Sequence, residues 1–147
     1  MFRNILVPTD GTELSHKAIK GAVQLARQQK ARLTALHVVP PYESGMRDEA
    51  SVLHYLSPQH YAERTRAVAQ KHLAVVGKAA AAAGVSCELV QVSGRFPFEE
   101  ILRSAQRKKC DLIYMASHGR RGIARLLLGS ETSKVLAHST IPVLVCR

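Results

Sequence analysis

The sequence contains no tryptophan, and only 5% of its 147 residues are aromatic. Surfaces that bind single-stranded nucleic acid stack bases on aromatic side chains set among basic residues, and no segment of this chain has that composition. Cysteine is also scarce. Cys87, Cys110 and Cys146 are far apart, odd in number and without C-x-x-C spacing, which argues against a zinc site and a disulfide framework. We expect the three thiols to act as small apolar residues in strands.

Long apolar runs are missing as well. No stretch approaches the ~18 residues that a transmembrane helix needs. The apolar segment at residues 1–8 is too short for the core of a signal peptide, and no small-residue cleavage site follows it. We therefore expect a cytoplasmic protein with no membrane association.

Acidic residues are few, with 11 against 21 lysines and arginines, so the formal net charge is +10. Such an excess favours anionic partners, or it simply keeps a soluble surface self-repelling, and composition leaves both interpretations open. For nucleic acid we expect only weak, non-specific association. The basic residues gather in two clusters, namely Arg103, Arg107, Lys108 and Lys109, and then Arg120, Arg121 and Arg125.

Several nucleotide-binding and catalytic motifs are absent. The patterns G-x-x-x-x-G-K-[ST] and G-x-G-x-x-G do not occur, which excludes a P-loop NTPase and leaves a dinucleotide-binding fold without its fingerprint. The hydrolase motif G-x-S-x-G would need glycine where Met115 stands, two residues before Ser117. A receiver domain needs an aspartate at the end of its third strand, where this chain has Val92-Ser93-Gly94.

The residues that are present alternate between strand and helix patterns from end to end. Apolar runs and partial alternation predict strands at residues 2–7, 33–39, 85–92, 112–116 and 141–146. Helical spacing predicts helices after Gly11, over 60–83 with Gly84 as the stop signal, over 97–105 and over 129–138. Thr12 or Ser15 is expected to cap the first helix.

This alternation predicts an α/β fold in one domain, residues 1–147, with a five-stranded parallel sheet and helices on both faces. Residues 40–58 have weak periodicity. A structureless loop of that length is unusual in a compact domain, so this segment is either partly helical or a lid over a site.

Ligands of such sheets bind beyond the carboxyl ends of the strands, where the strand order reverses. Residues 8–11 follow the first strand, and residues 116–122 follow the fourth and lead to Gly129 and Ser130. Glycines allow close backbone approach, a helix start presents unpaired N–H groups, and arginines add charge. The pattern predicts a cradle for phosphates, but a glycine-rich loop with a serine cap is also common in α/β proteins.

Asp10 and His118 have two interpretations each, and His37 has one. Asp10 either holds a Mg²⁺ that bridges phosphates or closes the first strand with an Asx turn. His118 is either an acid or base, or a hydrogen-bonding neighbour of the site, and the second role is favoured. His37 lies in a strand and is expected to be a satisfied core residue.

The sequence resembles the universal stress protein family over nearly its whole length. The matching segments are 5–11 (ILVPTDG), 37–38 (HV), 111–119 (DLIYMASHG), 127–130 (LLGS) and 142–145 (PVLV). This resemblance implies a Rossmann-like fold of the adenine nucleotide alpha hydrolase-like type, with strand order 3-2-1-4-5.

The ATP-binding branch of that family carries G-x2-G-x9-G-[ST], and here Ala116 replaces the first glycine. The added methyl group is expected to weaken or preserve ATP binding and not to abolish it. The resemblance implies that adenine is flanked by Pro8, Thr9 and Val38, that Asp10 faces a Mg²⁺, and that Gly119, Gly129, Ser130, Glu131 and Thr132 meet the phosphates and ribose. The remaining predicted contacts are Met115, Ala116, His118, Arg120 and Gly122.

The resemblance also implies a homodimer through antiparallel pairing of the last strands, residues 141–146, and an apolar strand at a sheet edge invites such pairing. Its functional implication is a stress-response or signalling protein whose ATP occupancy changes binding to unknown protein partners. The alternative is a dimeric interaction module that binds no nucleotide. A dedicated hydrolase using Asp10 or His118 is disfavoured because no activated nucleophile is visible, so the chain is at most a slow ATPase.

Overall fold

The computed structural model describes residues 1–42, 57–118 and 128–147. Strands and helices alternate along the chain, and all five strands join one parallel sheet in the order β3-β2-β1-β4-β5. The elements are β1 (Asn4–Pro8), α1 (Glu13–Gln29), β2 (Arg32–Val39), α2 (Pro58–Ala82), β3 (Cys87–Ser93), α3 (Pro97–Arg107), β4 (Leu112–Ala116), α4 (Ser130–His138) and β5 (Val143–Cys146). The predicted class and strand order are confirmed.

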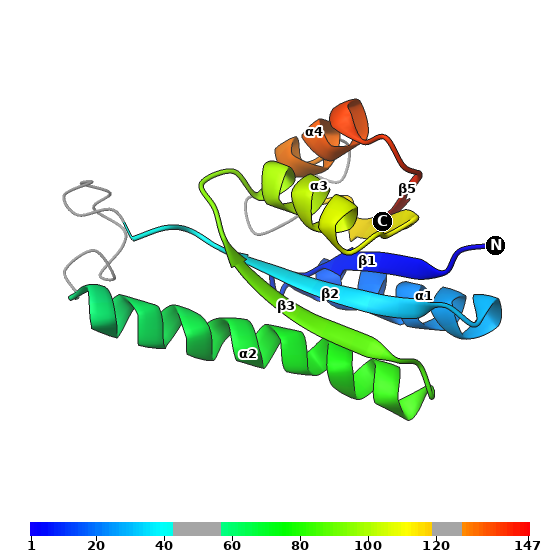
Figure 1. The fold of residues 1–147 in the computed structure, drawn as a ribbon, viewed down its shortest axis with the longest axis horizontal. Helices are drawn as coiled ribbons and strands as arrows, with labels where there is room; N and C mark the ends of the chain where they lie inside the picture. Colours follow the sequence, from blue (N-terminus) through cyan, green and yellow to red (C-terminus); the bar gives the residue numbers. More distant parts are fainter. Residues whose placement is uncertain (43–56, 119–127) are drawn as a thin grey trace.

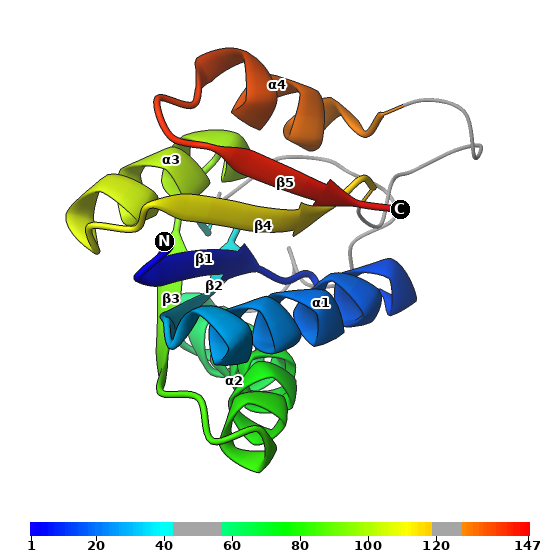
Figure 2. The ribbon, with the colours of Figure 1, turned by 90° about the vertical axis from the view of Figure 1, so that its right-hand side faces the viewer.

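The helices cover the two faces of the sheet in pairs, α1 with α2 on one face and α3 with α4 on the other (Figure 1, Figure 2). Alternate residues of the central strands point to opposite faces. Ile5 and Val7 accordingly pack under α1 and α2, whereas Leu6 packs under α3 and α4. Because both faces are covered, β1 is almost fully buried, as expected for a parallel sheet.

Local hydrogen bonds explain where the first two helices begin. Thr12 is the N-cap of α1 and accepts a hydrogen bond from the Ser15 N–H, so Thr12 and not Ser15 is the cap. Ser57 caps α2 through the His60 N–H, and Pro58 occupies the first helical turn. Helix α2 therefore begins two residues before the predicted start. The predicted partial helix or lid at 40–58 lies mostly at residues 43–56, outside the described residues.

Three strands start later than the sequence pattern predicts, and each delay has a local cause. The N–H of Arg3 donates to the Asp111 side chain, and β1 starts at Asn4. The Val85 N–H donates to the Ala80 carbonyl at the end of α2, which keeps residue 85 out of β3. The Ile141 N–H donates to the hydroxyl of Ser139, and β5 starts at Val143.

The cysteines follow the expectation with one correction. Cys87 and Cys146 lie in β3 and β5, but Cys110 lies between α3 and β4, where its N–H donates to the Ala105 carbonyl. All three are free thiols, and Cys110 is buried. None of the helices in the described part of the chain is both long and apolar enough to cross a membrane.

Candidate functional site

The strand order reverses between β1 and β4, which are neighbours at the centre of the sheet. Helix α1, which follows β1, packs on one face of the sheet, and α4, which follows β4, packs on the other (Figure 2). Open α/β sheets bind ligands at the edge formed by the carboxyl ends of two such neighbouring strands. The predicted site residues Pro8, Thr9, Asp10, Val38, Met115 and Ala116 lie at or next to this edge.

The end of β1 is held by a compact set of hydrogen bonds. The Thr9 N–H donates to the Leu36 carbonyl of β2, and the hydroxyls of Thr9 and Ser15 lie 2.7 Å apart. The Oδ1 atom of Asp10 accepts from the Thr12 N–H at 3.0 Å and from the Thr12 hydroxyl at 2.7 Å. The Asx turn proposed for Asp10 is therefore present. The metal-binding role of the same carboxylate remains a prediction.

His37 at the end of β2 is hydrogen-bonded, as expected, but it is only half-buried. Its Nδ1 lies 2.8 Å from the Thr9 carbonyl oxygen, and its ring meets the His72 ring of α2 edge-on, with centroids 4.9 Å apart. The His72 ring also fills the space beside Gly11, where a β-carbon would lie 2.3 Å from Nε2. Sequence reasoning missed His72, because a helical histidine carries no signal of such a distant contact.

The end of β4 brings Ser117 and His118 together. The Ser117 N–H donates to the Cys146 carbonyl of β5, and its hydroxyl lies 2.9 Å from Nδ1 of His118. This pair does not form a hydrolytic dyad, because Ser117 is only 1% exposed and cannot reach a substrate. The Nε2 atom of His118 is buried and has no hydrogen-bond partner among residues 1–42, 57–118 and 128–147. His118 is therefore hydrogen-bonded to Ser117, and its place beside a ligand remains a prediction.

Helix α4 is fastened to the end of β4 by two contacts. The Gly129 N–H donates to the Ser117 carbonyl at 2.8 Å, and a β-carbon at position 129 would lie 3.0 Å from that oxygen and 3.2 Å from Cα of His118. The buried hydroxyl of Thr132 donates to the Ala116 carbonyl at 3.0 Å. Gly129 thus permits a close approach between protein backbones, and the Thr132 hydroxyl is already engaged within the fold.

Glu131 is engaged within the fold as well. Its Oε2 accepts a hydrogen bond from the Phe98 N–H in the first turn of α3, and its Oε1 accepts from Lys134. The carboxylate therefore links two helices. What the start of α4 offers a ligand is its backbone N–H groups and the exposed side chain of Ser130.

The four helix starts differ in how their first N–H groups are satisfied. Thr12 serves α1, Ser57 serves α2, and Glu131 serves α3. Helix α4 has Gly129 as its N-cap and receives no capping bond from a side chain in the described part of the chain. An uncapped helix start presents free donors and the positive end of the helix dipole, which together fit an anionic group.

Three predicted contacts, Gly119, Arg120 and Gly122, fall within residues 119–127, outside the described residues. Val38 and Met115 pack against the core on the α3 and α4 face. No group of three or more histidine, cysteine, aspartate or glutamate side chains gathers within residues 1–42, 57–118 and 128–147 to hold a metal ion.

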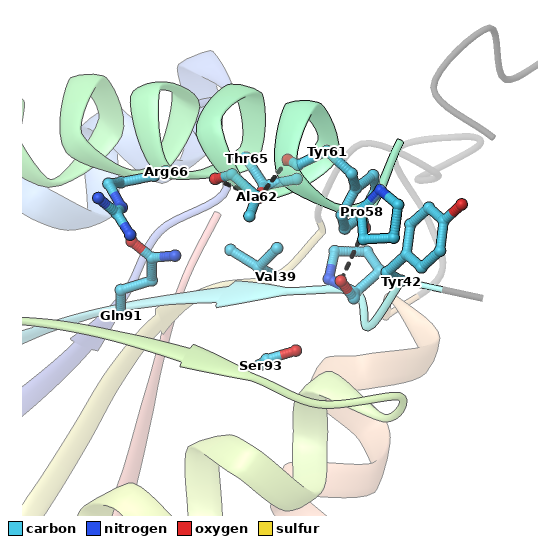
Figure 3. Close-up of a pocket in the computed structure, with 10 residues that line it drawn as sticks. Val39, Tyr42, Pro58, Tyr61, Ala62, Thr65, Arg66, Gln91 and Ser93 are labelled. Carbon is cyan, nitrogen blue, oxygen red and sulfur yellow. Dashed lines mark hydrogen bonds between the residues drawn. The ribbon is translucent and has the colours of Figure 1, made fainter. Parts of the chain in front are cut away.

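Sequence reasoning also missed a cavity of about 270 Å³ beneath the first turns of α2, where β2 and β3 end (Figure 3). The Tyr61 hydroxyl donates to the Pro40 carbonyl at 2.7 Å, and the rings of Tyr42 and Tyr61 lie 5.4 Å apart. Val39 lines the cavity, whereas the predicted site residue Val38 faces the other side of the sheet. None of the predicted site residues lines it.

The whole chain, residues 1–147, matches the model of the universal stress protein family. Universal stress protein YxiE of Bacillus subtilis is 35% identical, with full coverage of both chains. The solved structure of protein MJ0577, named among the curated relatives as a universal stress protein of Methanocaldococcus jannaschii, superposes with a TM-score of 0.81 at 29% identity, covering 99% of this chain and 96% of that one. A universal stress protein solved in complex with cAMP has a TM-score of 0.72 at 26% identity, covering 99% and 97%. The chain belongs to the universal stress protein family.

Proposed function

We propose that this chain binds an adenine nucleotide, ATP, at the carboxyl edge between β1 and β4, and that the bound nucleotide changes its binding to protein partners. The observation that carries the proposal is the uncapped start of α4, which lies against the end of β4. Two further observations support it. Nε2 of His118, at the same strand end, is buried and has no hydrogen-bond partner in the described part of the chain, and a relative of the same fold was solved with cAMP.

The phosphates would meet the first N–H groups of α4 and the Ser130 hydroxyl, with Gly119, Arg120 and Gly122 contributing from the preceding segment. The adenine would lie near Pro8, Thr9 and Val38. Asp10 would hold a Mg²⁺, which when bound supplies positive charge between phosphate oxygens. The side chains of Glu131 and Thr132 would act indirectly, by holding α4 against α3 and β4.

The rest of the proposal concerns the whole protein. We propose a cytoplasmic homodimer that pairs through β5, which is the last strand at one edge of the sheet. Its partners are proteins of unknown identity and not specific nucleic acids. ATP would act as a regulatory ligand, turned over slowly at most, since the Ser117 hydroxyl beside His118 is buried and the Thr12 hydroxyl, which donates to Asp10, serves as the N-cap of α1.

A charge placed at the start of α4 tests the site. Ser130→Glu should remove ATP binding, or weaken it about tenfold or more, because a carboxylate would stand where the phosphates bind. The same change should preserve or raise stability, because an acidic residue in the first turn favours the helix. Titration calorimetry with ATP and Mg²⁺ measures the affinity, and thermal unfolding measures the stability.

Ala137→Glu is the matched control, since Ala137 is exposed and lies about 10 Å further along the same helix, near its end. It adds the same charge at about a Debye length and should leave ATP binding within about twofold. If the unaltered protein gives no heat at millimolar ATP while folded, or if both variants bind ATP equally, the site is wrong.

The alternative function is a dimeric interaction module that binds no nucleotide. Ala116 favours it, and so does the engagement of Glu131 and Thr132 within the fold. Native mass spectrometry of gently purified protein separates the two functions. Co-purified ATP or ADP supports the nucleotide site, whereas an empty stable dimer that also ignores added ATP supports the alternative.

A further inference from the structure

A second cavity, of about 350 Å³, opens at the opposite edge of the sheet, where the strands begin. It lies between the end of α1, the start of β2 and the turn from α2 to β3, which gather on the right-hand side of Figure 1. Its volume falls in the range typical of small-molecule sites. The lining residues are Ala26, Arg27, Lys30, Ala31, Arg32, Gly84, Val85 and Ser86.

The cavity is lined by cations and by no carboxylate. Arg27, Lys30 and Arg32 all border it, and none of them forms an ion pair within the described part of the chain. The nearby acidic residues are already engaged. Glu88 pairs with Lys108, and the Asp111 carboxylate accepts from backbone N–H groups at the start of β1. Among the described residues, neither of these carboxylates therefore forms an ion pair with a cation of the cavity.

Part of this charge faces the end of α1, and the helix dipole there does not cancel it. A helix C-terminus carries about half of a negative elementary charge. Arg27 lies in the last turn and Lys30 is the C-cap, so these two cations alone exceed that partial charge. Arg32 belongs to β2 and lies outside the helix altogether. Helix α2 also ends beside this cavity, just before Gly84, and its C-terminus adds about half of a negative charge, so the three cations exceed the two helix dipoles by about two units.

The cavity combines a fixed floor with an open mouth. Ala26, Ala31 and Val85 are buried and form an apolar floor. At Gly84 a β-carbon would meet no atom within 4 Å, so the rim beside it is open. The exposed Ser86 adds a hydroxyl to the rim. Long cationic side chains that lie over an apolar floor can converge on a multiply charged ligand. A single arginine can bind two oxygens of one phosphate group.

We propose that this cavity binds a small free oligophosphate, a linear chain of two or three phosphate groups, at a site separate from the nucleotide site. The proposal does not depend on the function proposed above, because the two sites lie at opposite edges of the sheet and share no residue. Arg27, Lys30 and Arg32 hold the anion, and the Ser86 hydroxyl donates to a phosphate oxygen.

Nuclear magnetic resonance with sodium tripolyphosphate tests the proposal at near-physiological salt. Titration into ¹⁵N-labelled protein should shift the amide signals of Arg32, Gly84 and Ser86 in a saturable manner. The double variant Arg27→Gln, Arg32→Gln should weaken this binding about tenfold or more, since it removes two charge-assisted contacts.

The matched control is Lys17→Gln, Lys20→Gln, which removes the same charge from exposed positions in earlier turns of α1. It should leave the dissociation constant within about twofold, because charges beyond a Debye length are largely screened. Circular dichroism verifies that both double variants fold.

Three results would overturn the proposal. The first is equal weakening in both double variants, which would mean diffuse charge attraction. The second is an absence of shifts at Arg32, Gly84 and Ser86. The third is tighter binding at these amides by a short single-stranded oligonucleotide than by tripolyphosphate, which would assign the surface to nucleic acid. Failure of this proposal is distinguishable from failure of the proposed ATP site, because binding at the ATP site would shift the amide signals at the start of α4 instead.

Discussion

At Gly11 the imidazole of His72 occupies the space that a β-carbon would need, and the backbone has a φ of +79°. Both facts restrict the position to glycine, for different reasons: L side chains disfavour this φ, and the ring leaves no room. Gly84 has a similar φ of +68° but open space around it. Alanine substitutions at the two glycines therefore separate the energetic cost of the unfavourable φ from the cost of the steric contact with His72.

Gly11→Ala should lower the free energy of unfolding by about 2–4 kcal/mol, and Gly84→Ala by about 1–2 kcal/mol. The shared part is the strained backbone, and the excess at position 11 is the displacement of His72. Urea unfolding at neutral pH measures both values. Equal losses in the two variants would show that the ring moves aside at no cost.

The sequence did not predict the contact between Gly11 and His72. Residues close in sequence, such as Asp10 and Thr12, were within reach of local reasoning, and the Asx turn was one of the two interpretations given for Asp10. His72 lies 61 positions further along the chain, and only the packing of α2 on the sheet brings it to β1. Contacts of this kind depend on the tertiary structure and have no local pattern.

Helix α4 is hydrogen-bonded both to the end of β4 and to the start of α3. Its start is fastened to β4 by the Thr132 hydroxyl and by Gly129, and it is joined to α3 by Glu131. The sequence predicted this helix over 129–138, and the structure has Ser130–His138 with Gly129 as the N-cap. It assigned Glu131 and Thr132 to a ligand through resemblance. The bonds they form within the protein depend on how α3 and β4 are placed.

Thr132→Val should lower the free energy of unfolding by about 1–2 kcal/mol, because the similarly shaped side chain leaves the Ala116 carbonyl without its hydroxyl donor. Thr132→Ser keeps that donor, loses one methyl group and should cost about 1 kcal/mol or less. Chemical denaturation of the two variants side by side gives the comparison. A valine variant as stable as the native protein would mean that the bond contributes nothing.

For the whole molecule, the topology was the most predictable feature. Strand and helix patterns alternate so regularly that a parallel sheet with helices on both faces follows, and strand order came from the family resemblance. Element ends were less predictable. The starts of β3 and β5 are set by the bonds of Val85 to Ala80 and of Ile141 to Ser139, which hydrophobic patterns do not encode.

The thiols of Cys87 and Cys110 make the free energy of unfolding depend on pH in the alkaline range. Burial raises the pKa of the Cys110 thiol, although a hydrogen bond with Thr34 opposes the shift, and burial likewise raises the pKa of Cys87. These groups keep their protons in the folded state at a pH where the unfolded chain has begun to lose them. The unfolded state then binds fewer protons, so the free energy of unfolding falls as the pH rises.

We expect the urea midpoint to decrease as the pH rises above the ordinary thiol pKa of about 8.5. Cys110→Ala should reduce that slope, since the variant has one fewer buried acid. The variant is compared with the native protein at constant ionic strength. Lysines also lose protons in this pH range, but they do so in both proteins, so their effect cancels in the comparison. An unchanged slope in the variant would exclude Cys110 as a contributor.

The bond from the Phe98 N–H to Glu131 has a mechanical consequence. It ties the beginnings of two helices that have different neighbours in the sheet, since α4 is fastened to β4 and α3 also contacts β2. If the first turn of α4 is displaced, either the first turn of α3 moves with it or the hydrogen bond from Phe98 to Glu131 breaks. The exposed ring of Phe96, just before α3, would then change position when α4 is displaced.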